Sequence, residues 1–238
     1  MKQIGKVIGV AILFAAAEVG GAAGYEAVDV KGGGTIVGEV DFDGNPPPAK
    51  KIEVTKDQEV CGKEKEAEDL IVSADKKIAN AIVSISDIEK GKKLEPTTVT
   101  LDQKGCHYVP HVLMVPAGST VKILNSDGIL HNIHTYGKKN PPVNIAQPKF
   151  KKEVSTKFDQ PENVDVKCDA HAWMGGVFVV QDNPYYAMTD EKGTFKLTDV
   201  PPGEYTLKVW HEKLGEKTEK VKVEAGKEAK VVFKLAAK

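Results

Sequence analysis

The chain has 238 residues, a formal net charge of -1 and a pI of about 6.6. This length is enough for one large β domain or two smaller ones, each able to bury its own core. All 33 basic residues are lysines, and arginine is absent. Because the guanidinium fork that reads phosphates and guanines is missing, and because there is no bulk positive charge, the composition argues against a nucleic-acid partner.

The first 24 residues have the composition of a secretory signal peptide. Two lysines precede an apolar run over residues 7–17, and small residues follow it. The run is too short to span a bilayer as a helix, and an uncleaved anchor is the alternative. The sequence does not choose between cleavage after Ala17, Ala23 and Gly24. We expect an exported, periplasmic protein with a signal peptide over residues 1–24 and no stable membrane insertion after cleavage.

Short alternations of apolar and polar residues run through the rest of the chain. One example is the series Val154, Thr156 and Phe158. Turn signals separate these runs at residues 43–45, 46–48, 116–118, 127–128 and 201–203. Only residues 59–69 have the pattern of a short helix. The sequence therefore predicts an all-β fold of sandwiches or barrels.

Two ends of the chain resemble one known fold. Residues 189–195 (TDEKGTF) and 200–207 (VPPGEYTL) resemble the second half of a carboxypeptidase regulatory-like, transthyretin-type β-sandwich. Residues 34–40 (GTIVGEV), followed by a proline-rich turn, resemble its opening strands. The resemblance implies one sandwich split between residues 30–103 and 183–238, with residues 104–182 inserted as a separate domain. Three β segments in a row, without an insertion, are the alternative.

The chain has three cysteines, Cys61, Cys106 and Cys168. In an oxidising compartment an odd number leaves one cysteine after pairing. The remaining thiol needs a reason to stay reduced, and metal ligation is such a reason.

Residues 168–174 bring together three side chains that can bind a soft metal. Cys168, His171 and Met174 have the spacing Cys-x2-His-x2-Met, and His131 lies upstream after a turn. Taken singly, each has an ordinary explanation as a buried thiol, a turn histidine or a core methionine. Two imidazoles, one thiolate and a weak axial thioether are together the donor set of a type 1 copper electron-transfer site. The sequence predicts one such copper ion.

Residues 106–182 resemble a cupredoxin, and among cupredoxins most closely the amicyanins and pseudoazurins. The matching segments are the Cys-x2-His-x2-Met loop, residues 115–121, His131 to His134, and residues 177–180. The resemblance implies that His131, Cys168 and His171 are the strong ligands and Met174 the axial one. It also implies that Asn132 ties the two ligand-bearing segments together behind the metal, and that His134 is not a ligand.

Three further expectations accompany the resemblance. Cys61 and Cys106 form a disulfide that pins the inserted domain to its host, with two free thiols as the alternative. His171 is the route by which electrons enter and leave. Ala172 and Trp173 form an apolar docking surface for a weakly bound partner.

The predicted function is single-electron transfer between redox partners, a cytochrome or a dehydrogenase by resemblance, without enzyme activity. A mononuclear site with an open position, supported by Asp169 or His134, is one alternative. A copper-handling protein is another, and it would favour ligands that exchange readily. A third is a non-redox binding module braced by copper.

Overall fold

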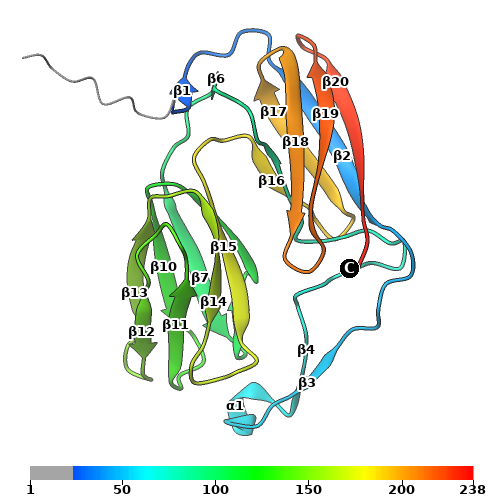
Figure 1. Cartoon of the computed structure of the whole chain (residues 1–238). Helices are drawn as coiled ribbons and strands as arrows, with labels where there is room; N and C mark the ends of the chain where they lie inside the picture. Colours follow the sequence, from blue (N-terminus) through cyan, green and yellow to red (C-terminus); the bar gives the residue numbers. More distant parts are fainter. Residues whose placement is uncertain (1–23, 238) are drawn as a thin grey trace, which may run out of the picture.

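The computed structural model describes residues 24–237, so the predicted signal peptide lies almost wholly outside the described residues. The described chain is all-β, as predicted, apart from one helical turn. No helix within these residues is long and apolar enough to cross a membrane. Two β-sandwiches lie side by side, and a thin extension leaves one of them and reaches toward the far end of the other (Figure 1).

The first sandwich is formed by segments from both ends of the described chain. One sheet has the order β16-β5-β18-β19, with strands β5 (Ile82–Ile85), β16 (Tyr186–Met188), β18 (Gly203–His211) and β19 (Gly215–Val223). The other has the order β17-β2-β20, with strands β2 (Gly34–Phe42), β17 (Thr194–Val200) and β20 (Glu228–Leu235). Along β2, the side chains of Ile36, Val40 and Phe42 enter the core between the sheets.

The second sandwich is formed by the middle of the chain. One sheet has the order β13-β10-β7-β8, with strands β7 (Thr98–Lys104), β8 (His107–Val109), β10 (Ser119–Asn125) and β13 (Glu153–Phe158). The other has the order β12-β11-β14-β15-β9, with strands β9 (Val112–Pro116), β11 (His131–Tyr136), β12 (Asn144–Gln147), β14 (Glu162–Lys167) and β15 (Gly175–Gln181). Phe158 and Phe178 meet edge to face across the core, with ring centroids 5.4 Å apart.

Strand β15 is buried along almost its whole length because both of its faces are covered. Phe178 and Val180 face the core of the second sandwich. Val177 and Val179 pack instead into a small cluster with Ile82 of the first sandwich. The two sandwiches therefore share an apolar contact along β15.

Strand pairing moves one of the predicted boundaries. Strand β7 begins at Thr98 and pairs in parallel with β10, so residues 98–103 belong to a sheet of the second sandwich and not to the first. The sequence placed this boundary at residue 103 because the candidate metal-binding residues lie after it. The sequence alone does not show which strands pair. The division into a split host and an inserted domain stays a prediction, with its first boundary placed before Thr98.

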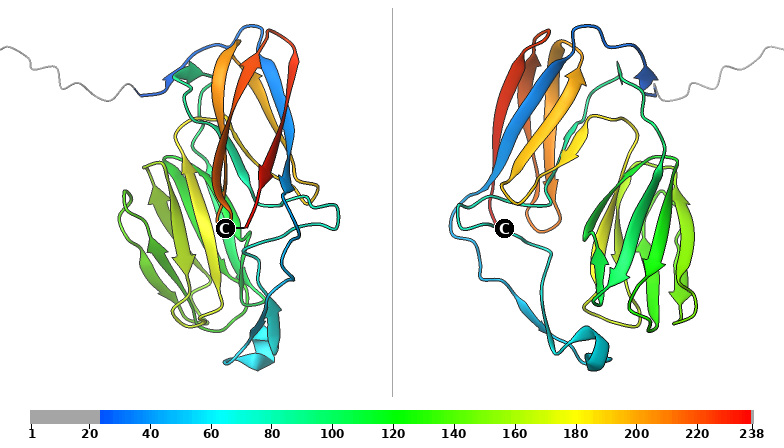
Figure 2. Two further views of the ribbon diagram at one scale, coloured as in Figure 1. Left: turned by 45° about the vertical axis from the view of Figure 1, so that its right-hand side comes forward. Right: turned by 180° about the vertical axis from the view of Figure 1, so that it is seen from behind.

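A segment between β2 and β5, here called the strap (residues 51–66), covers one end of the second sandwich (Figures 1 and 2). It contains β3 (Lys51–Glu53), α1 (Gln58–Cys61) and β4 (Glu64–Glu66). Most of the predicted helix at residues 59–69 is wrong, because Gly62, with a φ of 79°, ends α1 and β4 then pairs with β3. The predicted disulfide between Cys61 and Cys106 is present. It fastens α1 to the turn between β7 and β8. The remaining strands are β1 (Glu26–Ala27) and β6 (Lys90–Gly91), which pair with each other.

Candidate metal centre

Three of the predicted ligands converge at the end of the second sandwich that the strap covers. His131 opens β11, while Cys168 and His171 lie in the loop between β14 and β15. The Nδ1 atoms of the two imidazoles are 3.0 Å apart, and the Sγ atom of Cys168 is 3.7 Å from Nδ1 of His171. All three ligand atoms lie within 4.8 Å of one another. Both imidazoles are 0% exposed and Cys168 is 4% exposed, so this donor set is shielded from water.

Backbone hydrogen bonds close the loop that carries Cys168 and His171. The N–H group of Met174 donates to the carbonyl of His171 (3.0 Å), and the N–H group of Cys168 donates to the carbonyl of Met174 (3.2 Å). Strands β14 and β15 pair up to Lys167 and Gly175, which leaves a short, fixed connection. Met174, the predicted axial ligand, is buried in the same core cluster as Cys168.

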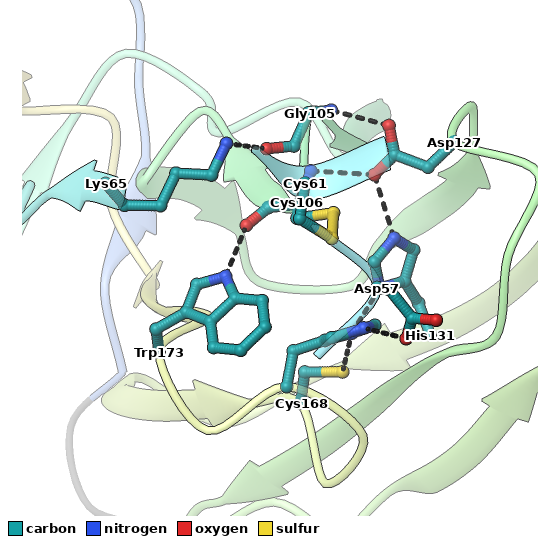
Figure 3. Close-up of a disulfide and its surroundings, with 10 residues drawn as sticks. Asp57, Cys61, Lys65, Gly105, Cys106, Asp127, His131, Cys168 and Trp173 are labelled. Atoms are coloured by element: carbon teal, nitrogen blue, oxygen red, sulfur yellow. Dashed lines mark hydrogen bonds and ion pairs between the residues drawn. A yellow bond between two sulfur atoms is a disulfide. The ribbon is translucent and has the colours of Figure 1, made fainter. Parts of the chain in front are cut away.

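The outer nitrogen of each imidazole is hydrogen-bonded to a carboxylate. Nε2 of His131 lies 2.8 Å from Oδ2 of Asp127 (Figure 3). Nε2 of His171 lies 2.9 Å from Oδ2 of Asp57, which belongs to the strap. In each ring, the candidate ligand atom Nδ1 and the carboxylate-bound atom Nε2 therefore lie on different edges.

Asn132 connects the strand of His131 to the loop of Cys168. Its Oδ1 atom accepts a hydrogen bond from the backbone N–H group of Asp169 (3.2 Å), and its Nδ2 atom donates to Oδ1 of Asn144 (2.7 Å). The hydroxyl group of Tyr108 donates to the Asn132 carbonyl. These contacts join β11, the loop after β14 and β12 through one side chain.

Burial sets the protonation preferences of the donors. It raises the pKa of the Cys168 thiol, with backbone hydrogen bonds opposing the shift. It also lowers the pKa of His131, against the opposing hydrogen bond of Asp127. The metal-free pocket therefore favours a neutral imidazole and a neutral thiol. A metal ion would have to displace the thiol proton as it binds.

Two other histidines of the second sandwich lie outside this donor set. Nδ1 of His134 is 3.1 Å from both carboxylate oxygens of Asp169, and its ring stacks on Tyr136. His107 contacts Glu68 at 2.7 Å. His134 is therefore not among the residues whose candidate ligand atoms converge.

The remaining two histidines lie at the junction of the sandwiches. Nε2 of His111 is 2.6 Å from Oε1 of Glu212, which belongs to the loop after β18. His211 is buried. The end of β18 lies near the second sandwich, where the neighbouring Glu212 contacts His111.

The predicted electron route and docking surface need correction. His171 has no exposed surface, because Asp57 of the strap covers its outer nitrogen. Trp173 is half-buried, donates its indole N–H to the carbonyl of Cys106 (3.3 Å) and lines a cavity of about 320 Å³ between the sandwiches. Of the two residues of the predicted patch, only Ala172 is exposed.

Sequence reasoning missed the two carboxylates at the site. Asp127 precedes His131 by four residues in a turn, a spacing that could have suggested contact. Asp57 lies 114 residues from His171 in sequence, within a run of charged residues, and no local signal indicates it.

Comparison with known proteins gives one family match. Residues 174–236 match the model of the carboxypeptidase regulatory-like domain. This confirms the predicted resemblance for the C-terminal part of the first sandwich. No curated protein matches the chain.

Several solved structures of copper proteins are similar to part of the chain. A copper-containing nitrite reductase (NirK) from Thermus scotoductus SA-01 has 26% identity and a TM-score of 0.33, over 39% of this chain and 24% of that chain. The chain thus spans about a quarter of that protein. An amicyanin from Paracoccus versutus (Thiobacillus versutus) has 17% identity and a TM-score of 0.32, over 42% and 97% of the respective chains. A purple cupredoxin from Nitrosopumilus maritimus has 20% identity and a TM-score of 0.30, over 35% and 99%.

Proposed function

We propose that this protein holds one type 1 copper ion and passes single electrons between redox partners. The ligands would be His131, Cys168, His171 and Met174. The observation that carries the proposal is the convergence of two imidazole Nδ1 atoms and one thiol Sγ atom in a buried pocket. This donor set fits copper, because thiolate stabilises Cu(I) and imidazole accepts both oxidation states.

Bound copper would supply a one-electron couple, and the protein would supply a fixed, dry environment for it. The closed loop from Cys168 to Met174 limits movement of the donors between oxidation states. The burial of the three donor atoms favours electron transfer over binding of a small molecule to the metal. The proposal therefore includes no catalytic step.

The proposed setting is the periplasm or another exported location. The disulfide between Cys61 and Cys106 supports an oxidising compartment. The partner would be a redox protein, a cytochrome or a dehydrogenase. It would approach the exposed Ala172 side of the ligand loop rather than the covered His171 edge.

The test is the visible and EPR spectrum of the mature protein with one equivalent of Cu(II), before and after ascorbate. We expect an intense thiolate-to-copper band and narrow parallel hyperfine splitting, both lost on reduction and restored by an oxidant. Cys168→Ser should abolish the band and keep the far-UV circular dichroism. His134→Ala is the control and should keep the spectrum. A pale, tetragonal spectrum in the wild type, or a blue Cys168→Ser variant, would contradict the proposal.

A further inference from the structure

We propose, building on the proposed function, that Asp57 and Asp127 are positioning residues for the copper site. Each carboxylate holds one ligand imidazole by its outer nitrogen, and together they lower the reduction potential of the centre. The observation behind the proposal is that both imidazoles, and not only one, are hydrogen-bonded to an aspartate.

Asp127 is held rigidly by a turn. Gly105 and Cys106, both with positive φ, form the tight connection between β7 and β8 and point their N–H groups at its carboxylate. The N···O distances are 2.6 Å and 2.8 Å. The side chain of Asp127 is 7% exposed. Three donors, counting Nε2 of His131, therefore fix this carboxylate with little room to rotate.

Asp57 comes from outside the second sandwich. It precedes α1 in the strap, with a φ of 51°, and its carboxylate reaches Nε2 of His171. Four residues later, Cys61 is bonded to Cys106, so the disulfide anchors the segment that carries Asp57 (Figure 3). Val54 of the strap is buried in the core of the second sandwich and anchors the other side. His171 is therefore closed off from solvent by a segment fixed at two points.

This arrangement should change the reduction potential in one direction. A ring that binds metal through Nδ1 carries its proton on Nε2 and donates it to the carboxylate. Such a carboxylate fixes the ring orientation and makes the imidazole a stronger donor. Stronger donors, and two nearby negative charges, stabilise Cu(II) more than Cu(I). Both aspartates should therefore lower the reduction potential.

The experiment measures the reduction potential of the full-length, copper-loaded protein and of two isosteric variants, Asp57→Asn and Asp127→Asn. We expect Cu(II) affinity to fall by about tenfold relative to Cu(I) affinity in each variant, as for other outer partners of metal-bound histidine. A tenfold change corresponds to a rise of about 59 mV for one electron. The matched control is Asp169→Asn, which removes one charge next to Cys168 from a carboxylate that contacts His134 and neither ligand imidazole. Its shift should be clearly smaller.

A second measurement needs no copper. In the metal-free protein, the Nε2–H signals of His131 and His171 should be visible by ¹⁵N-edited NMR and protected from solvent exchange. Asp57→Ala should accelerate exchange at His171 and leave His131 protected, and Asp127→Ala should do the reverse.

Failure of the proposed function and failure of the positioning proposal give different results. A wild type without a type 1 spectrum would refute the proposed function, and the exchange data would still decide whether the aspartates hold the rings. A type 1 wild type whose potential is unchanged by both Asn variants would overturn the positioning proposal. So would shifts no larger than that of Asp169→Asn, because the effect would then be one of charge alone.

Discussion

Asn132 shows at the level of single atoms how the two halves of the centre are joined. Its side chain is held between the backbone of Asp169 on the ligand loop and the side chain of Asn144 on β12. The residue is 7% exposed, so water does not readily replace these partners.

Asn132→Ala should therefore lower the free energy of unfolding by about 1–3 kcal/mol, because it leaves the Asp169 N–H group and the Asn144 side chain without their partner. Urea unfolding of the metal-free protein measures this change. Asn163→Ala, at an exposed position of β14, is the control and should change stability by less than about 0.5 kcal/mol. Equal effects of the two substitutions would mean that Asn132 does not tie the segments together.

At the residue scale, the sequence predicted the part of the candidate site whose residues are close together in the chain. Cys168, His171 and Met174 lie within one short loop, and their spacing alone placed them together. The partner of His171 could not be predicted, because Asp57 reaches it only through the path of the strap and the disulfide. In the sequence, nothing distinguishes the Asp57 carboxylate from the other charged residues around it.

The strap is the element that distinguishes the covered end of the second sandwich. Its two short strands and single helical turn bury little apolar surface of their own, apart from Val54 and Cys61. The disulfide is therefore expected to supply much of what holds it in place. The cross-link joins residues 45 apart in sequence.

Replacing both Cys61 and Cys106 by Ala should destabilise the metal-free protein by roughly 3–4 kcal/mol, because the unfolded chain regains the freedom of the closed loop. The midpoint and slope of urea unfolding measure this loss. Cys168→Ala is the control, since it removes a thiol and leaves the disulfide intact. A loss below about 1 kcal/mol would show that strap packing, and not the cross-link, holds the segment.

The alternation pattern correctly predicted strands that have one face in contact with solvent. The alternation at Val154, Thr156 and Phe158 marks β13 correctly. Residues 59–69 were misread as a helix because their lysines and glutamates also suit a helical surface, and only Gly62 and the pairing of β3 with β4 exclude it.

At the scale of the whole molecule, the contact between the two sandwiches buries side chains whose burial cannot be predicted from single segments. His211 is the last residue of β18. In the fold it is buried, and burial together with the nearby charge of His111 lowers its pKa to about 4. An alternation pattern says which face of a strand is apolar, but it does not say that a second domain covers the strand end.

The ion pair between His111 and Glu212 crosses this junction and should make the stability of the protein depend on pH. Burial of His111 opposes its charged form, but the hydrogen bond and charge of Glu212, with smaller contributions from Glu68 and Asp69, raise its pKa overall. A raised folded-state pKa contributes stability that is fully present below the unfolded-state pKa. That stability is lost as the pH rises through the folded-state pKa.

Glu212→Gln should therefore destabilise the protein more at about pH 6 than at about pH 9, because only protonated His111 gains from the carboxylate. The measurement is urea unfolding of wild type and variant at both pH values, and the contribution of His211, present in both proteins, largely cancels in the difference. Glu216→Gln, at an exposed position of β19, is the matched control and should give a small difference that does not depend on pH. A Glu212→Gln effect of the same size at both pH values would mean that the contact acts as a neutral hydrogen bond. Titration of His111 would then not make the stability of the protein depend on pH.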